Sequence, residues 1–237
     1  MTAVRLAVLS DVHGNLAALR AVVRALADEG PLDRVVVAGD HVQGGPRPQE
    51  VWQTLNGLGW TLVRGNEDEA VAGVLGTAPA AHTGTGDYLL SYHAQLAWTR
   101  AVLGPATVRD LAALPPSWRT RTPAGELLVV HSSPRDTNDR CGAPENLAAD
   151  VTAAYGATGA AVIAFGHYHR SFVRPMPFAL LVNVASVSLA LDRRPLAAYT
   201  ILTATEDGWR VAQHRVPYDA AEEGAATRAR GLPAWLR

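Results

Sequence analysis

Seven side chains of types that commonly bind metal ions occur in short polar patches along this chain. They are two carboxylates, one carboxamide and four imidazoles: Asp11, His13, Asp40, Asn66, His131, His167 and His169. Together these nitrogen and oxygen donors suffice for two adjacent divalent cations, a site suited to phosphoester hydrolysis. A lone histidine is more often an ordinary surface or hydrogen-bonded residue, so the prediction depends on the ordered set and not on any one patch.

Continuous apolar runs precede nearly every patch and predict buried strands. Asn15 is a candidate N-cap for a helix over residues 16–26, and a second helix is expected from about residue 48 to 58. The alternation of strands and helices predicts an α/β fold whose site lies beyond the carboxyl ends of the strands. The apolar runs are residues 6–9, 35–38, 127–130 and 161–165, and residues 60–63, which include Thr61, also predict a strand.

The remaining chain has a different pattern. Residues from about 87 to 114 are expected to be helical, with a role in packing and not in chemistry. Residues 220–237 suit a short helix or a frayed tail. No linker-like stretch divides the chain, so we predict a single domain over residues 1–237. After His169, short strands are expected over residues 171–174, 178–184, 196–202 and 209–215.

Composition excludes several classes of function. The net charge of −1 gives no indication of a nucleic-acid partner, and no apolar run is long enough to span a membrane. The sequence contains no lysine, which excludes a lysine nucleophile. The single cysteine, Cys141, suits a reducing compartment, and the first residues run directly into a strand with no room for a signal sequence. We therefore expect a cytoplasmic protein.

The order and context of the patches resemble the calcineurin-like metallophosphoesterase superfamily, in its small bacterial and archaeal phosphodiesterase branch. The resemblance covers almost the whole chain, because residues 98–100, 183–187 and 216–219 also match. It implies two packed mixed β-sheets flanked by helices, a four-layer sandwich. The matching motifs are SDVHGN at 10–15, GDHVQGGP at 39–46, RGNED at 64–68, VVHSSPRD at 129–136 and GHYH at 166–169.

The resemblance also implies how the metals are shared. Asp40 would bridge the two ions and clamp a hydroxide between them for in-line attack on phosphorus. Ligands without a thiolate favour Mn, Fe, Zn, Co or Ni over Ca or Mg, and we take Mn as the first expectation. Glycines 39, 65 and 166 would let the backbone approach the ions closely. One metal would be held by Asp11, His13, Asp40 and His169, and the other by Asp40, Asn66, His131 and His167.

One residue departs from the family pattern. Glu67 stands where the family has the histidine that is its usual candidate for protonating the leaving group. A glutamate with an ordinary pKa of about 4.3 beside two dications should be ionised and a poor general acid. Its charge would largely cancel the positive surplus of the centre, which penalises a dianionic monoester more than a monoanionic diester. We therefore predict a preference for phosphodiesters, and a shift toward monoesters in Glu67→His.

Other polar residues beside the patches are candidates for contacts with a small-molecule phosphoester. His41 could act as a proton donor or phosphate contact, although a supporting role in its loop is the simpler interpretation. Arg135, Arg64 and Arg170 could bind phosphate oxygens, with Arg135 as the first choice. The pocket walls are expected from loops at residues 43–47, 77–86 and 134–144.

Two alternatives remain open. The enzyme could be a phosphomonoesterase or a hydrolase of the diadenosine tetraphosphate type. A protein-interaction scaffold is a candidate from another class, because the implied fold resembles that of a retromer subunit. The presence of all seven candidate ligands argues against the scaffold. The replacement of the usual histidine by Glu67 leaves the scaffold as an alternative.

Overall fold

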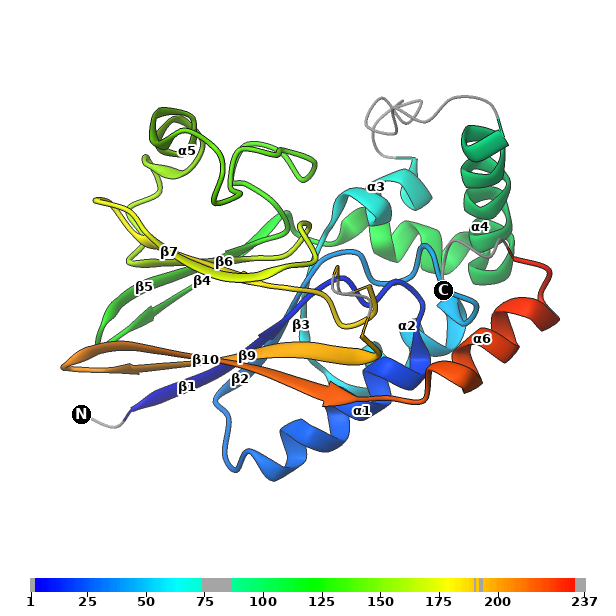
Figure 1. The fold of residues 1–237 in the computed structure, drawn as a ribbon, viewed down its shortest axis with the longest axis horizontal. Helices are drawn as coiled ribbons and strands as arrows, with labels where there is room; N and C mark the ends of the chain where they lie inside the picture. The colour runs from blue at the N-terminus through cyan, green and yellow to red at the C-terminus, as the bar shows by residue number, and fades with distance from the viewer. Residues whose placement is uncertain (1–2, 74–86, 190, 192–193, 233–237) are drawn as a thin grey trace.

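The computed structural model describes residues 3–73, 87–189, 191 and 194–232, so the expected wall loop at 77–86 lies outside the described residues. Two five-stranded mixed sheets stack face to face, as Figure 1 shows. Helices α1 (Leu16–Asp28) and α2 (Pro48–Leu58) cover the outer face of the first sheet, and α5 (Ala148–Tyr155) covers that of the second. The expected α/β sandwich is confirmed.

The first sheet has the strand order β10-β9-β1-β2-β3. The three strands β1, β2 and β3 are parallel, whereas β9 is antiparallel to β1, and β10 to β9. The strand bounds are β1 Val4–Leu9, β2 Arg34–Ala38, β3 Thr61–Val63, β9 Leu196–Thr205 and β10 Gly208–Pro217.

The second sheet has the order β4-β5-β6-β8-β7. Here β5, β6 and β8 are parallel, and the antiparallel strands β4 and β7 form the two edges. The strand bounds are β4 Ser117–Thr122, β5 Gly125–Val130, β6 Val162–Phe165, β7 Ser171–Pro175 and β8 Leu180–Val184.

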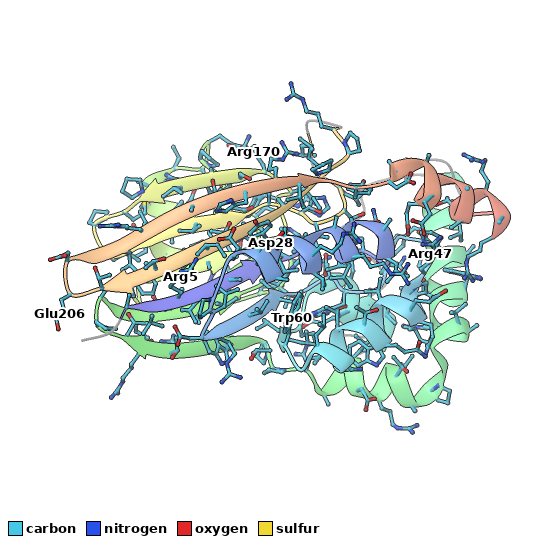
Figure 2. All side chains as sticks on the ribbon, turned by 90° about the horizontal axis from the view of Figure 1, so that it is seen from below. Arg5, Asp28, Arg47, Trp60, Arg170 and Glu206 are labelled. Atoms are coloured by element: carbon cyan, nitrogen blue, oxygen red, sulfur yellow. The ribbon has the colours of Figure 1, made fainter. Side chains whose placement is uncertain are left out.

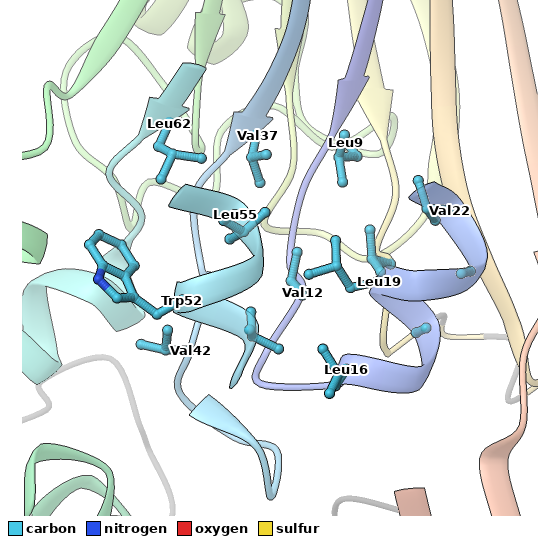
Figure 3. Close-up of a cluster of buried hydrophobic side chains, with 14 of the residues drawn as sticks. Leu9, Val12, Leu16, Leu19, Val22, Val37, Val42, Trp52, Leu55 and Leu62 are labelled. Atoms are coloured by element: carbon cyan, nitrogen blue, oxygen red, sulfur yellow. The ribbon is translucent and has the colours of Figure 1, made fainter. Parts of the chain in front are cut away.

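Successive side chains of a strand point to opposite faces of its sheet, and both faces are covered by apolar layers. Leu6 and Val8 of β1 pack between the sheets against residues such as Val129, whereas Ala7 and Leu9 face the helices. Figure 3 shows Leu9 beside side chains that α1 and α2 contribute to this outer layer. The buried faces fix the register of β1, and its end therefore delivers Asp11 to a defined place.

Three further helices complete the described chain: α3 (Asn66–Ala72), α4 (Asp87–Ala113) and α6 (Ala220–Ala229). The expected continuous helix at 87–114 is interrupted, because Gly104 has φ 73° and ψ 166° and Pro105 follows it. Asn15 caps α1 as expected, its side chain accepting from the Ala18 N–H at 2.9 Å. Among the described residues, no helix combines the length and apolar composition that crossing a bilayer requires.

Candidate metal centre

All seven predicted ligands follow the carboxyl ends of parallel strands. In each sheet these ends point toward the same edge, where such folds collect ligands. The structure thus brings together residues from five strand ends: Asp11 and His13 after β1, Asp40 after β2, Asn66 after β3, His131 after β5, and His167 and His169 after β6.

A first group of donor atoms comes from the loops after β1 and β6. The His169 Nε2 atom lies 3.0 Å from Asp11 Oδ1 and 3.2 Å from His13 Nε2. One ligand atom from each of these three residues lies within 4.8 Å of the others, so one cation can contact all three.

A second group surrounds Asn66. Its Oδ1 atom lies 2.9 Å from His131 Nε2 and 3.0 Å from His167 Nδ1. His131 Nε2 is in turn 3.3 Å from Asp40 Oδ2. Atoms of Asp11, Asp40 and His131 also lie within 4.8 Å of one another, which places Asp11 close to both groups.

Asp40 lies between the two groups. Its Oδ2 atom is 3.8 Å from His13 Nε2 on one side and 3.3 Å from His131 Nε2 on the other. Its Oδ1 atom accepts the Glu67 N–H at 2.9 Å, which fixes the orientation of the carboxylate. The Asp40 carboxylate therefore lies between imidazole nitrogens of the two groups.

Backbone carbonyls orient three of the imidazoles. When an Nδ1–H donates to a carbonyl, the Nε2 atom is left to face a metal, an arrangement typical of metal-binding histidines. The Nδ1 atoms of His13, His131 and His169 lie 2.8, 2.7 and 3.0 Å from the carbonyl oxygens of Gln43, Ala38 and Leu189, respectively.

Backbone strain is concentrated at the same residues. Among the described residues, six that are not glycine have positive φ, and all but Ala185 are predicted ligands. This conformation is costly for side chains with a Cβ and persists where the surrounding structure imposes it, often at functional sites. The strained ligands are Asp11 (58°), His13 (49°), Asp40 (56°), His167 (67°) and His169 (54°).

Close backbone approach explains the neighbouring glycines. Gly39 has φ 89°, and a Cβ there would lie 2.5 Å from His131 Nδ1. A Cβ on Gly65 or Gly166 would collide with the carboxylate of Asp40 or Asp11. The absence of a Cβ at these three glycines therefore lets the backbone pack against the side chains of the candidate ligands.

Charges within the centre are strongly coupled. Burial opposes protonation of His131 and His13, but Asp40 and Asp11 outweigh it and raise the pKa values to about 10 and about 9. Despite their own burial, both carboxyl groups have lowered pKa values because of the histidines. His167 differs, since burial and the charge of His131 lower its pKa to about 4. The carboxylates of Asp11 and Asp40 therefore favour positive charge at the centre, in the form of protonated imidazoles.

Glu67 is buried beside the centre, and its surroundings differ from the sequence expectation. Burial, followed by the charge of Asp40, raises the pKa of Glu67 to about 7 instead of leaving it at an ordinary value. The Tyr92 hydroxyl of α4 donates to Glu67 Oε2 at 2.8 Å, which favours the anion. Dications in the adjacent groups would favour the anion further. Nothing local in the sequence pairs Tyr92 with Glu67, because the two are 25 residues apart.

The His41 side chain is not exposed to solvent. It is completely buried, and its Nδ1 atom lies 2.7 Å from Asp68 Oδ2. Asp68 also accepts the N–H groups of Asp40 and Gly65, both at 2.9 Å, and that of His41 at 3.0 Å. The geometry supports the simpler interpretation of His41, as part of the loop that holds Asp40. Asp68 was not expected to have a role, although an acid in the first turn of α3 is a recognisable capping signal.

The three candidate arginines each pair with an acid outside the ligand groups. The Arg64 guanidinium donates to Glu69 Oε1 at 3.0 Å and to the carbonyls of Ala112 and Leu114, so it has a structural role. The exposed Arg135 and Arg170 pair with Asp139 at 2.8 Å and with Glu145 at 2.6 Å. A phosphate contact would require either of them to leave its partner.

The sequence as a whole matches one family. Residues 4–207 match the calcineurin-like phosphoesterase superfamily domain, a span that contains every predicted ligand. The chain belongs to this superfamily. Its members use divalent metals, in keeping with the two groups of donors described above.

Individual proteins match this chain over nearly their full length. A metallophosphoesterase from Sphaerobacter thermophilus is 28% identical, covers 99% of this chain and 97% of its own, and superposes with a TM-score of 0.73. A hypothetical protein from Pyrococcus horikoshii shares the fold with a TM-score of 0.81 at 20% identity, covering 98% and 96%. An uncharacterized protein from Methanocaldococcus jannaschii is 27% identical over 98% of this chain and 95% of its own.

Proposed function

We propose that this chain, as one domain over residues 1–237, is a cytoplasmic hydrolase of small-molecule phosphodiesters that uses two divalent transition-metal ions, with Mn as the first expectation. The observation that carries the proposal is the position of the Asp40 carboxylate between two groups of nitrogen and oxygen donors. Membership of a phosphoesterase superfamily supports hydrolysis as the reaction class.

The donor chemistry fits such ions. We assign Asp11, His13, Asp40 and His169 to one metal and Asp40, Asn66, His131 and His167 to the other. Three imidazoles are oriented by backbone carbonyls, and five of the ligands lie on backbone with positive φ that the surrounding structure must hold in place. When bound, the ions would supply Lewis-acid polarisation of the phosphoester and of the attacking water.

Substrate preference follows from the charge balance. Two dications carry more positive charge than Asp11, Asp40 and an attacking hydroxide can balance, and an ionised Glu67 would remove most of the surplus. Burial and the charge of Asp40 raise the pKa of Glu67 to about 7, and the Tyr92 hydroxyl and two bound dications would favour its anionic form. A phosphodiester with one negative charge then fits better than a monoester with two.

Roles outside the metal ligands are assigned from the contacts. We propose Glu67 as the residue that adjusts the charge of the centre, and His41 as a positioning residue for Asp40 through Asp68. Arg135 remains our first candidate for a phosphate contact, because it is exposed and can exchange Asp139 for substrate. Arg170 is a second candidate of the same kind.

Metal analysis combined with ester hydrolysis tests the proposal. The purified protein should contain two equivalents of transition metal and should hydrolyse bis-4-nitrophenyl phosphate faster than 4-nitrophenyl phosphate. Asp40→Asn should lose both metal and turnover, whereas Asp110→Asn, at an exposed position on α4, serves as the matched control. Bound metal without turnover of any ester would favour the interaction scaffold, and a clear monoester preference would contradict the role of Glu67.

A further inference from the structure

A cavity of about 460 Å³ adjoins the metal centre. His13 and Asn15 line it from the loop after β1, and Leu189, whose carbonyl faces His169 Nδ1, lines it from the loop after β8. A volume of this order is typical of small-molecule sites. Because His13 belongs to the first donor group, a substrate bound there at phosphorus can extend into this space.

The far wall of the cavity comes from α6 and the residues just before it. These residues lie beyond residue 207, where the family match ends, so the wall is a feature of this chain that the match does not cover. Tyr218, which lines the cavity, donates from its hydroxyl to the Ser188 carbonyl at 3.3 Å. Figure 2 labels Arg47 on the side of the molecule that carries α6, where it pairs with Glu222 at 2.5 Å.

The buried face of α6 is polar, which is unusual for a surface helix. Such helices normally bury an apolar stripe. The buried residues of α6 are instead Glu223 and Thr227, and both line the cavity. The Ala17 N–H and Arg47 explain one oxygen of the Glu223 carboxylate, Oε2, but not the other.

Glu223 retains unused hydrogen-bonding capacity. It is 7% exposed, and its Oε2 atom accepts the Ala17 N–H at 3.4 Å, with Arg47 Nη1 at 3.6 Å. Its Oε1 atom is buried and has no hydrogen-bond partner among the described residues. An unsatisfied buried oxygen is costly and gains from a ligand that donates to it.

The surrounding charges restrict what that donor can be. Arg194 and Arg228 line the same cavity, and Arg47 lies beside Glu223, so an added cation would be repelled. A neutral hydroxyl group can donate to the carboxylate without adding charge. We propose that this cavity binds one alcohol group of the phosphodiester, and that Glu223 selects alcohols bearing further hydroxyl groups, such as the sugar of a nucleoside. This inference rests on the proposed function.

Two diesters that release the same phenol test the inference in the metal-loaded, full-length protein. The first is adenosine 5′-(4-nitrophenyl phosphate), and the second is ethyl 4-nitrophenyl phosphate, which has no hydroxyl group. We expect Glu223→Gln to lower the ratio of their kcat/KM values by about tenfold or more, the effect of losing a hydrogen bond to a charged acceptor. Glu222→Gln is the matched control, because it removes the ion pair with Arg47 and keeps the Glu223 carboxylate in the cavity.

The possible outcomes distinguish a failure of the role proposed for Glu223 from a failure of the proposed phosphodiesterase function. An unchanged ratio in Glu223→Gln, or an equal drop in Glu222→Gln, overturns the role of Glu223 while hydrolysis itself stands. Hydrolysis of neither diester by the wild-type protein overturns the proposed function and the inference with it. If Glu223→Gln does not fold, competition decides: inhibition of ethyl ester hydrolysis by millimolar adenosine supports the cavity assignment, and no inhibition overturns it.

Discussion

Replacing Asp68 by asparagine should weaken both the fold and the metal centre. The Asp68 side chain is completely buried and accepts four hydrogen bonds. Three of them hold Asp40 and His41 after β2, and the fourth holds Gly65 before α3. One carboxylate therefore connects the loop of the proposed bridging ligand to the loop of Asn66.

The size of the effect follows from these contacts. In Asp68→Asn an amide NH₂ must replace one carboxylate oxygen, so at least one buried donor loses its acceptor and faces another donor. A hydrogen bond to a charged group contributes about 1.5–3 kcal/mol, and a stranded buried donor costs about 1–3 kcal/mol. We expect the free energy of unfolding to fall by about 2–4 kcal/mol, which for a chain of this length lowers Tm by roughly 5–15 °C.

Thermal and urea unfolding in EDTA measure the effect on the fold without a contribution from bound metal. Isothermal titration with Mn²⁺ then measures the centre, where we expect an affinity loss of about 10- to 100-fold, as for other residues that support ligands. Asp110→Asn should change the free energy of unfolding by less than about 0.5 kcal/mol. Stability and metal affinity of Asp68→Asn both equal to those of Asp110→Asn would refute the reasoning.

Three further predictions concern the same centre. In metal-free protein, His13 and His131 have folded-state pKa values of about 9 and about 10, above the ordinary 6.5. Their protonated forms therefore stabilise the fold fully below pH 6.5. This stabilisation is lost as the pH rises through 9 and 10. Unfolding in EDTA between pH 6 and 10.5 should show the loss; a rise over that range would contradict it. Glu67→His should raise monoester relative to diester hydrolysis in steady-state assays, and an unchanged ratio would exclude the charge argument. Tyr92→Phe should lower the free energy of unfolding by about 1–2 kcal/mol, because a buried carboxylate loses its phenol donor; an unchanged urea midpoint would disprove it.

Local sequence patterns were sufficient to locate the strands that carry the candidate ligands. Each apolar run predicted a strand that the structure contains, and parallel strand ends bring Asp11, Asp40 and His131 to one edge. The Asn15 cap was equally predictable, because a polar residue before an apolar-periodic stretch is a local signal. The break at Gly104 in α4 had a local signal too, a glycine followed by proline, but the apolar faces on either side gave the appearance of one helix.

The properties that tune the centre were not predictable in the same way. The pKa of Glu67 depends on burial and on Asp40, and neither can be inferred from the residues beside it in the chain. The contact from Tyr92 depends on how α4 packs against α3. Glu223 illustrates the same limit, because only the folded chain places a carboxylate of the C-terminal helix in a cavity next to His13.

Anomalous diffraction from crystals grown with Mn²⁺ tests the central claim most directly. The account predicts two anomalous peaks at the carboxyl ends of the strands, each about 2.2 Å from an oxygen of Asp40. A single peak, no peak, or two peaks of which only one contacts Asp40 would contradict it.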